Sequence, residues 1–124
     1  MHLLVADDNE INLRVACAYL KSIGVPESAI ATAANGQEAI DLCLVHQFDL
    51  VFMDIQMPKV DGVAAAKEIL QNHDHKPAIV ALTANMSPDS EREYLDIGMQ
   101  MVIHKPVSKT AFLEALQLAH PNVA

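Results

Sequence analysis

The sequence predicts an α/β domain in which a doubly wound, five-stranded parallel sheet is covered by five helices. Short apolar runs recur at intervals of roughly 25 residues, the length of a strand plus a crossover helix, and apolar residues between them repeat at helical spacing. The hydrophobic fraction is 52%, but only 4% of the residues are aromatic, and such an aliphatic core suits a parallel sheet covered on both faces. The 124 residues fit one domain, residues 1–124, with a buried core.

Five segments have the composition of buried strands. They are residues 3–7, 29–33, 48–53, 78–83 and 100–104. With right-handed crossovers, the expected strand order is 2-1-3-4-5, in which strands one and three lie side by side where the order reverses.

Polar N-cap residues and glycines mark where the five expected helices begin and end. The first helix begins after Asn9 and reaches about Ile23, before Gly24. The others run from Asn35-Gly36 to about His46, from Gly62 to Leu70, from Ser87 or Asp89 to Gly98, and from Ser108 to about His120.

Four polar residues stand at or just past the C-terminal end of an apolar run: Asp8, Asp54, Thr83 and Lys105. Ligands of an open parallel sheet bind outside the carboxyl ends of its strands, so these four side chains are expected to converge on one pocket. Two carboxylates there can hold a hard divalent cation such as magnesium, while a lysine and a hydroxyl suit phosphoryl oxygens. The pattern therefore predicts phosphoryl-transfer chemistry.

Charge and hydropathy exclude several other classes of function. The formal net charge of -8 argues against direct binding to nucleic acid or to an anionic membrane, because both need a basic surface. No apolar stretch is long enough to span a bilayer. Cys17 and Cys43 lie in expected helices without a CxxC pattern, which favours small buried thiols in a reducing cytoplasm over a disulfide.

Several stretches in order resemble the receiver domains of bacterial response regulators and hybrid sensor kinases, from about Leu3 to His120. They are Val5-Ala6-Asp7-Asp8-Asn9, Met53-Asp54-Ile55-Gln56-Met57-Pro58, Asp61-Gly62, Ala81-Leu82-Thr83-Ala84-Asn85 and Lys105-Pro106. The fourth stretch, with Gly98-Met99, is most similar to receivers of hybrid kinases. The resemblance implies a flavodoxin-like fold, and a histidine kinase or histidine phosphotransfer domain as partner.

By this resemblance Asp54 is the phosphoacceptor, and a carboxylate can indeed attack phosphorus to form an aspartyl phosphate. Asp8 and Asp54 would bind Mg²⁺ directly, with Asp7 acting largely through water and the Gln56 carbonyl oxygen completing the site. So small a set of protein ligands fits magnesium, which keeps several of its waters.

The resemblance also gives Lys105 and Thr83 their roles. Lys105 would pair with Asp54, and with the phosphoryl group once Asp54 is modified. The Thr83 hydroxyl would donate to a phosphoryl oxygen and draw the following loop inward. Receivers catalyse their own phosphorylation and dephosphorylation, so all three residues are catalytic candidates. The Lys105-Pro106 peptide is expected to be cis.

One position departs from the family pattern. Receivers often carry an aromatic residue three positions before this lysine, and the residue here is Val102. Valine has a stiff χ1 and no ring to swing, so we expect coupling from Asp54 to the last strand to be weak or to take an unusual form. The change near Val102 should be small, while the local change at Thr83 should survive.

Two other functions and two other parent architectures are alternatives to a hybrid-kinase receiver. A haloacid dehalogenase type of hydrolase also uses a strand-end aspartate, but it needs a second acid two residues later, and Gln56 stands there. A receiver that serves purely as an interaction module would lack one or more of the four key residues of the site, but all four are present here. The parent could also be a stand-alone response regulator, or one with a separate output domain. The expected location is the cytoplasm, free or joined to a membrane-bound parent kinase.

Overall fold

The computed structural model describes residues 2–57, 60–72, 76–84 and 87–119. Its strands are β1 (Leu3–Ala6), β2 (Ile30–Ala33), β3 (Leu50–Asp54), β4 (Ala78–Thr83) and β5 (Met101–His104). Its helices are α1 (Glu10–Ile23), α2 (Gly36–Val45), α3 (Gly62–Asn72), α4 (Pro88–Asp96) and α5 (Lys109–Ala119), with a short 3-10 turn at Glu27–Ala29.

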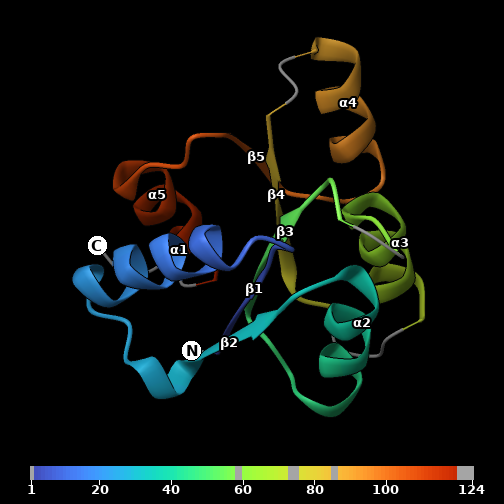
Figure 1. The fold of residues 1–124 in the computed structure, drawn as a ribbon. Helices are drawn as coiled ribbons and strands as arrows, with labels where there is room; N and C mark the ends of the chain where they lie inside the picture. Colours follow the sequence, from blue (N-terminus) through green and yellow to red (C-terminus); the bar gives the residue numbers. More distant parts are fainter. Residues whose placement is uncertain (1, 58–59, 73–75, 85–86, 120–124) are drawn as a thin grey trace.

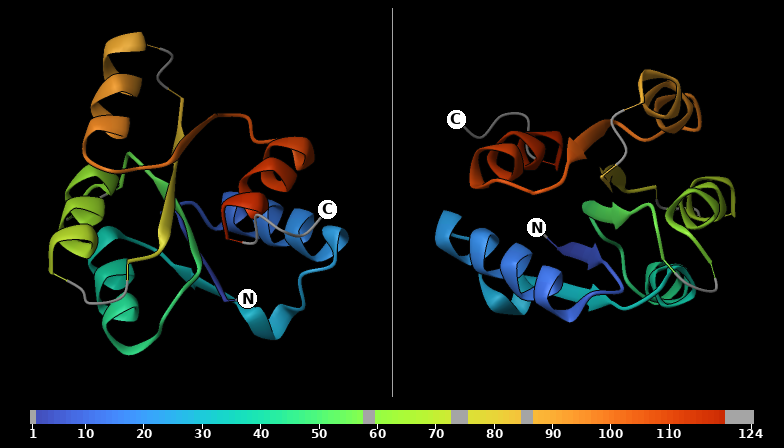
Figure 2. Two further views of the ribbon diagram at one scale, coloured as in Figure 1. Left: turned by 180° about the vertical axis from the view of Figure 1, so that it is seen from behind. Right: turned by 45° about the horizontal axis from the view of Figure 1, so that its top comes forward.

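The five strands form one parallel sheet in the order β2-β1-β3-β4-β5. Helices α1 and α5 cover one face, and α2, α3 and α4 lie on the other side (Figures 1 and 2). This is the predicted doubly wound, flavodoxin-like fold. The carboxyl ends of β1, β3, β4 and β5 therefore meet at one edge of the sheet.

Alternate residues of the buried strands pack into two separate cores. On β4, for example, Val80 and Leu82 pack towards α1 and α5, while Ile79 and Ala81 pack towards α2, α3 and α4. This alternation follows from the two-residue period of a strand, and it decides which side chains face which helices near the site.

Local signals in the sequence explain where several helices begin and end. The Asn9 side chain accepts from the amides of Ile11 and Asn12, capping α1 as predicted. Gly24 ends the helix in the left-handed region at φ 112°, a conformation that glycine adopts without steric cost. Asn35 caps α2 in the same way as Asn9, and the Ser108 hydroxyl accepts from the Ala111 amide in the first turn of α5.

Five predicted strand boundaries were wrong by one or two residues. The second strand begins at Ile30, not 29, because the preceding residues form the 3-10 turn. The third spans Leu50–Asp54, not 48–53, since its pairing with β1 begins where Leu3 faces Leu50. The first strand ends at Ala6 and the fifth begins at Met101. The expected features at Pro58, Asn85 and His120 lie outside the described residues.

Candidate functional site

The predicted site residues come together at the carboxyl edge of the sheet. Asp54 ends β3, Asp7 and Asp8 follow β1, Thr83 ends β4, and Lys105 follows β5. Since β1 and β3 are paired, with Ala6 facing Met53, the two acidic segments are direct neighbours. The convergence that the sequence predicts is therefore present.

Three carboxylates form the centre of this site. Asp7, Asp8 and Asp54 each place one oxygen within 4.8 Å of the other two. Asp7 and Asp54 are buried, at 2% and 3% exposure, whereas Asp8 is exposed. So close a group of negative charges is costly without a cation, and its hard oxygen ligands fit a magnesium ion.

Lys105 supplies one positive charge to the cluster. Its Nζ lies 3.2 Å from Asp54 Oδ1 and 3.3 Å from Asp7 Oδ2. The pairing with Asp54 agrees with the expectation from the family, but the contact with Asp7 was not foreseen. The peptide bond from Lys105 to Pro106 is cis, as predicted.

Backbone contacts fix the orientation of the carboxylates and the loops that carry them. The Asn9 amide donates to Asp7 Oδ1 at 2.9 Å, and the Gln56 amide donates to Asp54 Oδ1 at 3.3 Å. Gly62 packs against the Asp54 carbonyl so closely that a Cβ at this position would collide with it. The chain can therefore return over the site only with a glycine there.

The charges and burial shift two pKa values. Burial, and then the charge of Asp7, raise the pKa of Asp54 from 3.8 to about 6, against the opposing effects of Lys105 and the Gln56 amide. Burial alone would lower the pKa of Lys105, but the charges of Asp54 and Asp7 outweigh it and hold that pKa above its usual value. The site thus carries excess negative charge at neutral pH.

We expect the neutral variant Asp54→Asn to be more stable than the wild-type chain at pH 7 without divalent cations. Because the folded-state pKa of Asp54 is raised, its ionisation destabilises the fold progressively between about pH 4 and 6 and fully above that range, by roughly 1–3 kcal/mol. Urea unfolding at several pH values measures the difference, which should vanish below about pH 4. Equal stability at pH 7 would contradict this electrostatic description.

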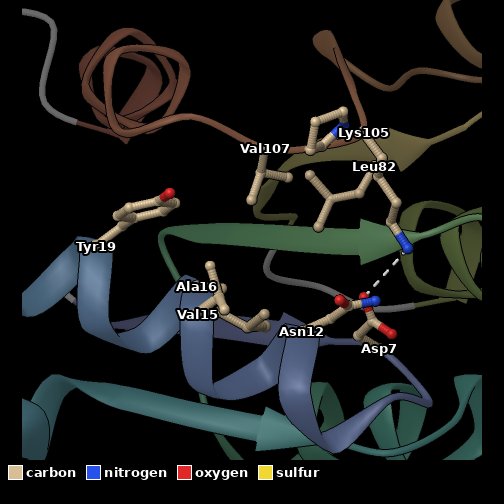
Figure 3. Close-up of a pocket in the computed structure, with 10 residues that line it drawn as sticks. Asp7, Asn12, Val15, Ala16, Tyr19, Leu82, Lys105 and Val107 are labelled. Carbon is tan, nitrogen blue, oxygen red and sulfur yellow. Dashed lines mark hydrogen bonds and ion pairs between the residues drawn. The ribbon is translucent and has the colours of Figure 1, made fainter.

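A cavity of about 470 Å³ opens beside the charged cluster, between α1 and the segment that follows β5. Figure 3 shows Asp7 and Lys105 at one end, with Val15, Ala16 and Tyr19 of α1 and Val107 along its length. On the outer surface of α1, Ile11 is 70% exposed and Val15 is 39% exposed. An apolar surface therefore adjoins the buried carboxylates. This surface was not predicted from the sequence.

The structure also shows the burial and the contacts of the other residues singled out in the sequence. Thr83 is buried at 2% exposure, and its carbonyl accepts from the Lys105 amide at 2.8 Å. The Gln56 side chain is exposed. Val102 is half-buried and packs against the core beneath α2, α3 and α4. Cys17 and Cys43 are free thiols and half-buried. None of the helices in the described part of the chain is long and apolar enough to span a membrane.

Comparison with known proteins decides the family. The family model of the response regulator receiver domain matches residues 3–117. The chain belongs to this family. Its receiver domain is 36% identical, over 94% of the chain, to part of the hybrid signal transduction histidine kinase K of Dictyostelium discoideum. It is 34% identical, over 90% of the chain, to part of the aerobic respiration control sensor protein ArcB of Escherichia coli.

The receiver spans only a small part of these relatives, 10% of the Dictyostelium kinase and 14% of ArcB. Among solved structures, the receiver domain of the sensor histidine kinase PA1611 from Pseudomonas aeruginosa, with a magnesium ion coordinated in the active site cleft, is 30% identical. The match to the PA1611 receiver has a TM-score of 0.81 and covers 94% of this chain and 93% of the PA1611 chain.

A second solved structure contains a partner protein. It is the Saccharomyces cerevisiae complex of the histidine phosphotransfer signaling protein Ypd1 with the receiver domain of its downstream response regulator Ssk1. The match has a TM-score of 0.86 and 27% identity, and it covers 100% of this chain and 92% of that chain. The fold is therefore shared with a receiver that was solved together with a histidine phosphotransfer signaling protein.

Proposed function

We propose that this receiver accepts a phosphoryl group from a phosphohistidine onto the carboxylate of Asp54, with Mg²⁺ bound. The observation that supports this most directly is the cluster of three carboxylates beside the Lys105 ammonium. Asp8 and Asp54 would hold the metal directly, Asp7 largely through water, and the Gln56 carbonyl oxygen would complete the set. The bound metal would neutralise charge that develops on the transferred group.

The side chains have distinct roles in the transfer. An Asp54 carboxylate oxygen attacks phosphorus as the P–N bond to the donor imidazole breaks, and the departing imidazole nitrogen keeps the bonding electron pair and takes a proton. Lys105 moves its ammonium from the carboxylate to the phosphoryl oxygens, and the Thr83 hydroxyl donates to one of them. These contacts are stronger when the phosphoryl group is present, so they favour a changed conformation.

A small-molecule donor tests this proposal without any partner protein. The chain is incubated with acetyl phosphate and Mg²⁺, and its intact mass is measured before and after. We expect the addition of one phosphoryl group, which disappears again on standing as the acyl phosphate hydrolyses. Absence of any adduct in the presence of Mg²⁺ would contradict the proposal.

The partner surface proposed for a histidine kinase or phosphotransfer domain is the outer face of α1 and the adjoining cavity. Exposed apolar side chains rarely gather next to buried charges without a binding role. Val15 lines the cavity together with Asp7 and Lys105, and the exposed Ile11 lies one helical turn before Val15 on α1. A donor helix placed there would present a phosphohistidine to the carboxylate cluster. The complex of Ypd1 with the Ssk1 receiver supports this kind of partner.

We expect Ile11→Glu to slow phosphotransfer from a phosphohistidine domain that phosphorylates the wild-type chain, by about tenfold or more, because it places a charge in an apolar contact. Val45→Glu on α2 is the matched control, since Val45 is 72% exposed and Ile11 70%. Transfer rates are followed with radiolabelled donor, and acetyl phosphate should label all three chains equally. Equal slowing by both variants would contradict an α1 docking surface.

We infer that the parent is a hybrid sensor histidine kinase, on the strength of the kinase relatives, and that the receiver works in the cytoplasm. A stand-alone response regulator, or one with a separate output domain, is the alternative architecture. The domains encoded next to this receiver distinguish these parents directly: a kinase core would support the first and a DNA-binding domain would contradict it.

A further inference from the structure

His104, the last residue of β5, lies between the phosphorylation site and α4. Side chains of β5 alternate between the two cores: Ile103 packs towards α1 and α5, and Val102 packs towards the opposite core. His104 therefore shares the face of Val102. Helix α4 lies beyond this end of β4 and β5 (Figure 1).

Among the described residues, the imidazole of His104 contacts α4 at the carboxylate of Glu91. Its Nε2 lies 3.7 Å from Glu91 Oε2, in the first turn of α4, and the two side chains are 34% and 44% exposed. Its Nδ1 is buried and has no hydrogen-bond partner among the described residues. An imidazole normally uses both nitrogens, and an unpaired buried one is unfavourable. The orientation of the His104 ring is therefore expected to change when the residues around it move.

On its other side, His104 is the sheet neighbour of Thr83. The two residues are paired in the parallel register of β4 and β5, and both follow the alternation that points away from α1 and α5. Paired strands are about 4.8 Å apart, so His104 and the residue that the phosphoryl group is proposed to attract are direct neighbours on the same face of the sheet. Val102, paired with Ala81, is two residues further from the site.

We propose that His104 is the positioning residue that transmits a change at Thr83 to α4, in a chain where Val102 provides no aromatic ring. The inference rests on the proposed function, because it is the phosphoryl group on Asp54 that draws the Thr83 hydroxyl inward. The His104 ring then moves towards Thr83, where its Nδ1 can form a hydrogen bond. This movement breaks the contact between Nε2 and Glu91. Helix α4 then moves away from β5.

The groups that face the ring come from two elements, α4 and β4. Among the described residues, Glu91 is the charged side chain that α4 presents to the ring. Beside it, β4 presents the neutral Thr83, and the neighbouring Lys105 ammonium is directed to Asp7 and Asp54. The contact with Glu91 is therefore the one that a movement of the ring would break.

The test compares amide NMR spectra of the whole chain with and without Mg²⁺ and beryllofluoride, which mimics the phosphoryl group. In the wild-type chain we expect Thr83, His104 and the α4 amides to shift, and Val102 to shift less. In His104→Gln and in Glu91→Gln, the α4 shifts should fall to about half or less while the Thr83 shift remains. Glu93→Gln, an exposed position on the same helix, is the matched control and should behave as wild type.

Retention of the Thr83 shift in both variants, with loss of the α4 shifts, is a combination that a loss of the site itself would not give. If the α4 amides of both His104→Gln and Glu91→Gln shifted as much as those of the wild-type chain, the proposed role of His104 would be overturned. The proposed function would remain intact. If beryllofluoride shifts no residue of the wild-type site, both proposals fall together. Shifts at Val102 as large as those at Thr83 and Ala84 would refute the argument from the missing aromatic.

Discussion

Asp54→Asn should abolish phosphorylation of this receiver by acetyl phosphate and by any phosphohistidine donor. The amide that replaces the carboxylate has almost the same shape, so it can still accept from the Gln56 amide, but it is not a nucleophile of comparable strength. Intact-mass analysis should show no adduct after a reaction that modifies the wild-type chain completely, a loss of at least about a hundredfold in rate.

Asp41→Asn is the control for this substitution, because Asp41 lies exposed on α2 and is not one of the three clustered carboxylates. It should be phosphorylated at the wild-type rate. If Asp54→Asn acquired a phosphoryl group as fast as the control, Asp54 would not be the acceptor, and a second acid such as Asp8 would have to be considered.

Asp8→Asn should weaken Mg²⁺ binding by at least about tenfold while leaving the fold intact. Asp8 is exposed and makes no hydrogen bond or ion pair with the described residues, in contrast to Asp7, whose oxygens accept from the Asn9 amide and from Lys105. Binding of a cation is therefore the role that best explains the Asp8 carboxylate. Calorimetric titration with Mg²⁺ measures the affinity, with Asp96→Asn on α4 as an exposed control.

The same variant should also slow phosphorylation by acetyl phosphate at low Mg²⁺ concentration and recover part of the rate at high concentration. Recovery is expected because a weakened metal site is filled by mass action. Unchanged affinity in Asp8→Asn would show that the acidic cluster is not the magnesium site.

The fold and the central site residues could be predicted because they depend on patterns that are local in sequence. Buried aliphatic runs mark the strands, and the rule that ligands bind at the carboxyl ends of parallel strands places Asp54, Thr83 and Lys105 together. The start of β2 was wrong because a 3-10 turn precedes it, and the start of β3 was wrong because its pairing begins where Leu3 faces Leu50. That start depends on register, which a single segment does not encode.

The features that were missed are contacts between elements far apart in the chain. The pair of Lys105 with Asp7 depends on how far a flexible side chain reaches across the sheet edge. The contact of His104 with Glu91 depends on the place of α4 over β5. The cavity beside α1 depends on the space left between α1 and the segment after β5. Such distances follow from tertiary packing, and hydrophobic periodicity contains no information about them.

The most direct test of the account locates the phosphoryl group chemically. The phosphorylated chain is treated with sodium borohydride, which reduces an aspartyl phosphate to homoserine, and the tryptic peptides are sequenced by mass spectrometry. We predict homoserine at position 54 and unmodified aspartate at positions 7 and 8. Homoserine at position 7 or 8, or a phosphoryl group that resists borohydride because it sits on a hydroxyl such as that of Thr83, would contradict the central claim.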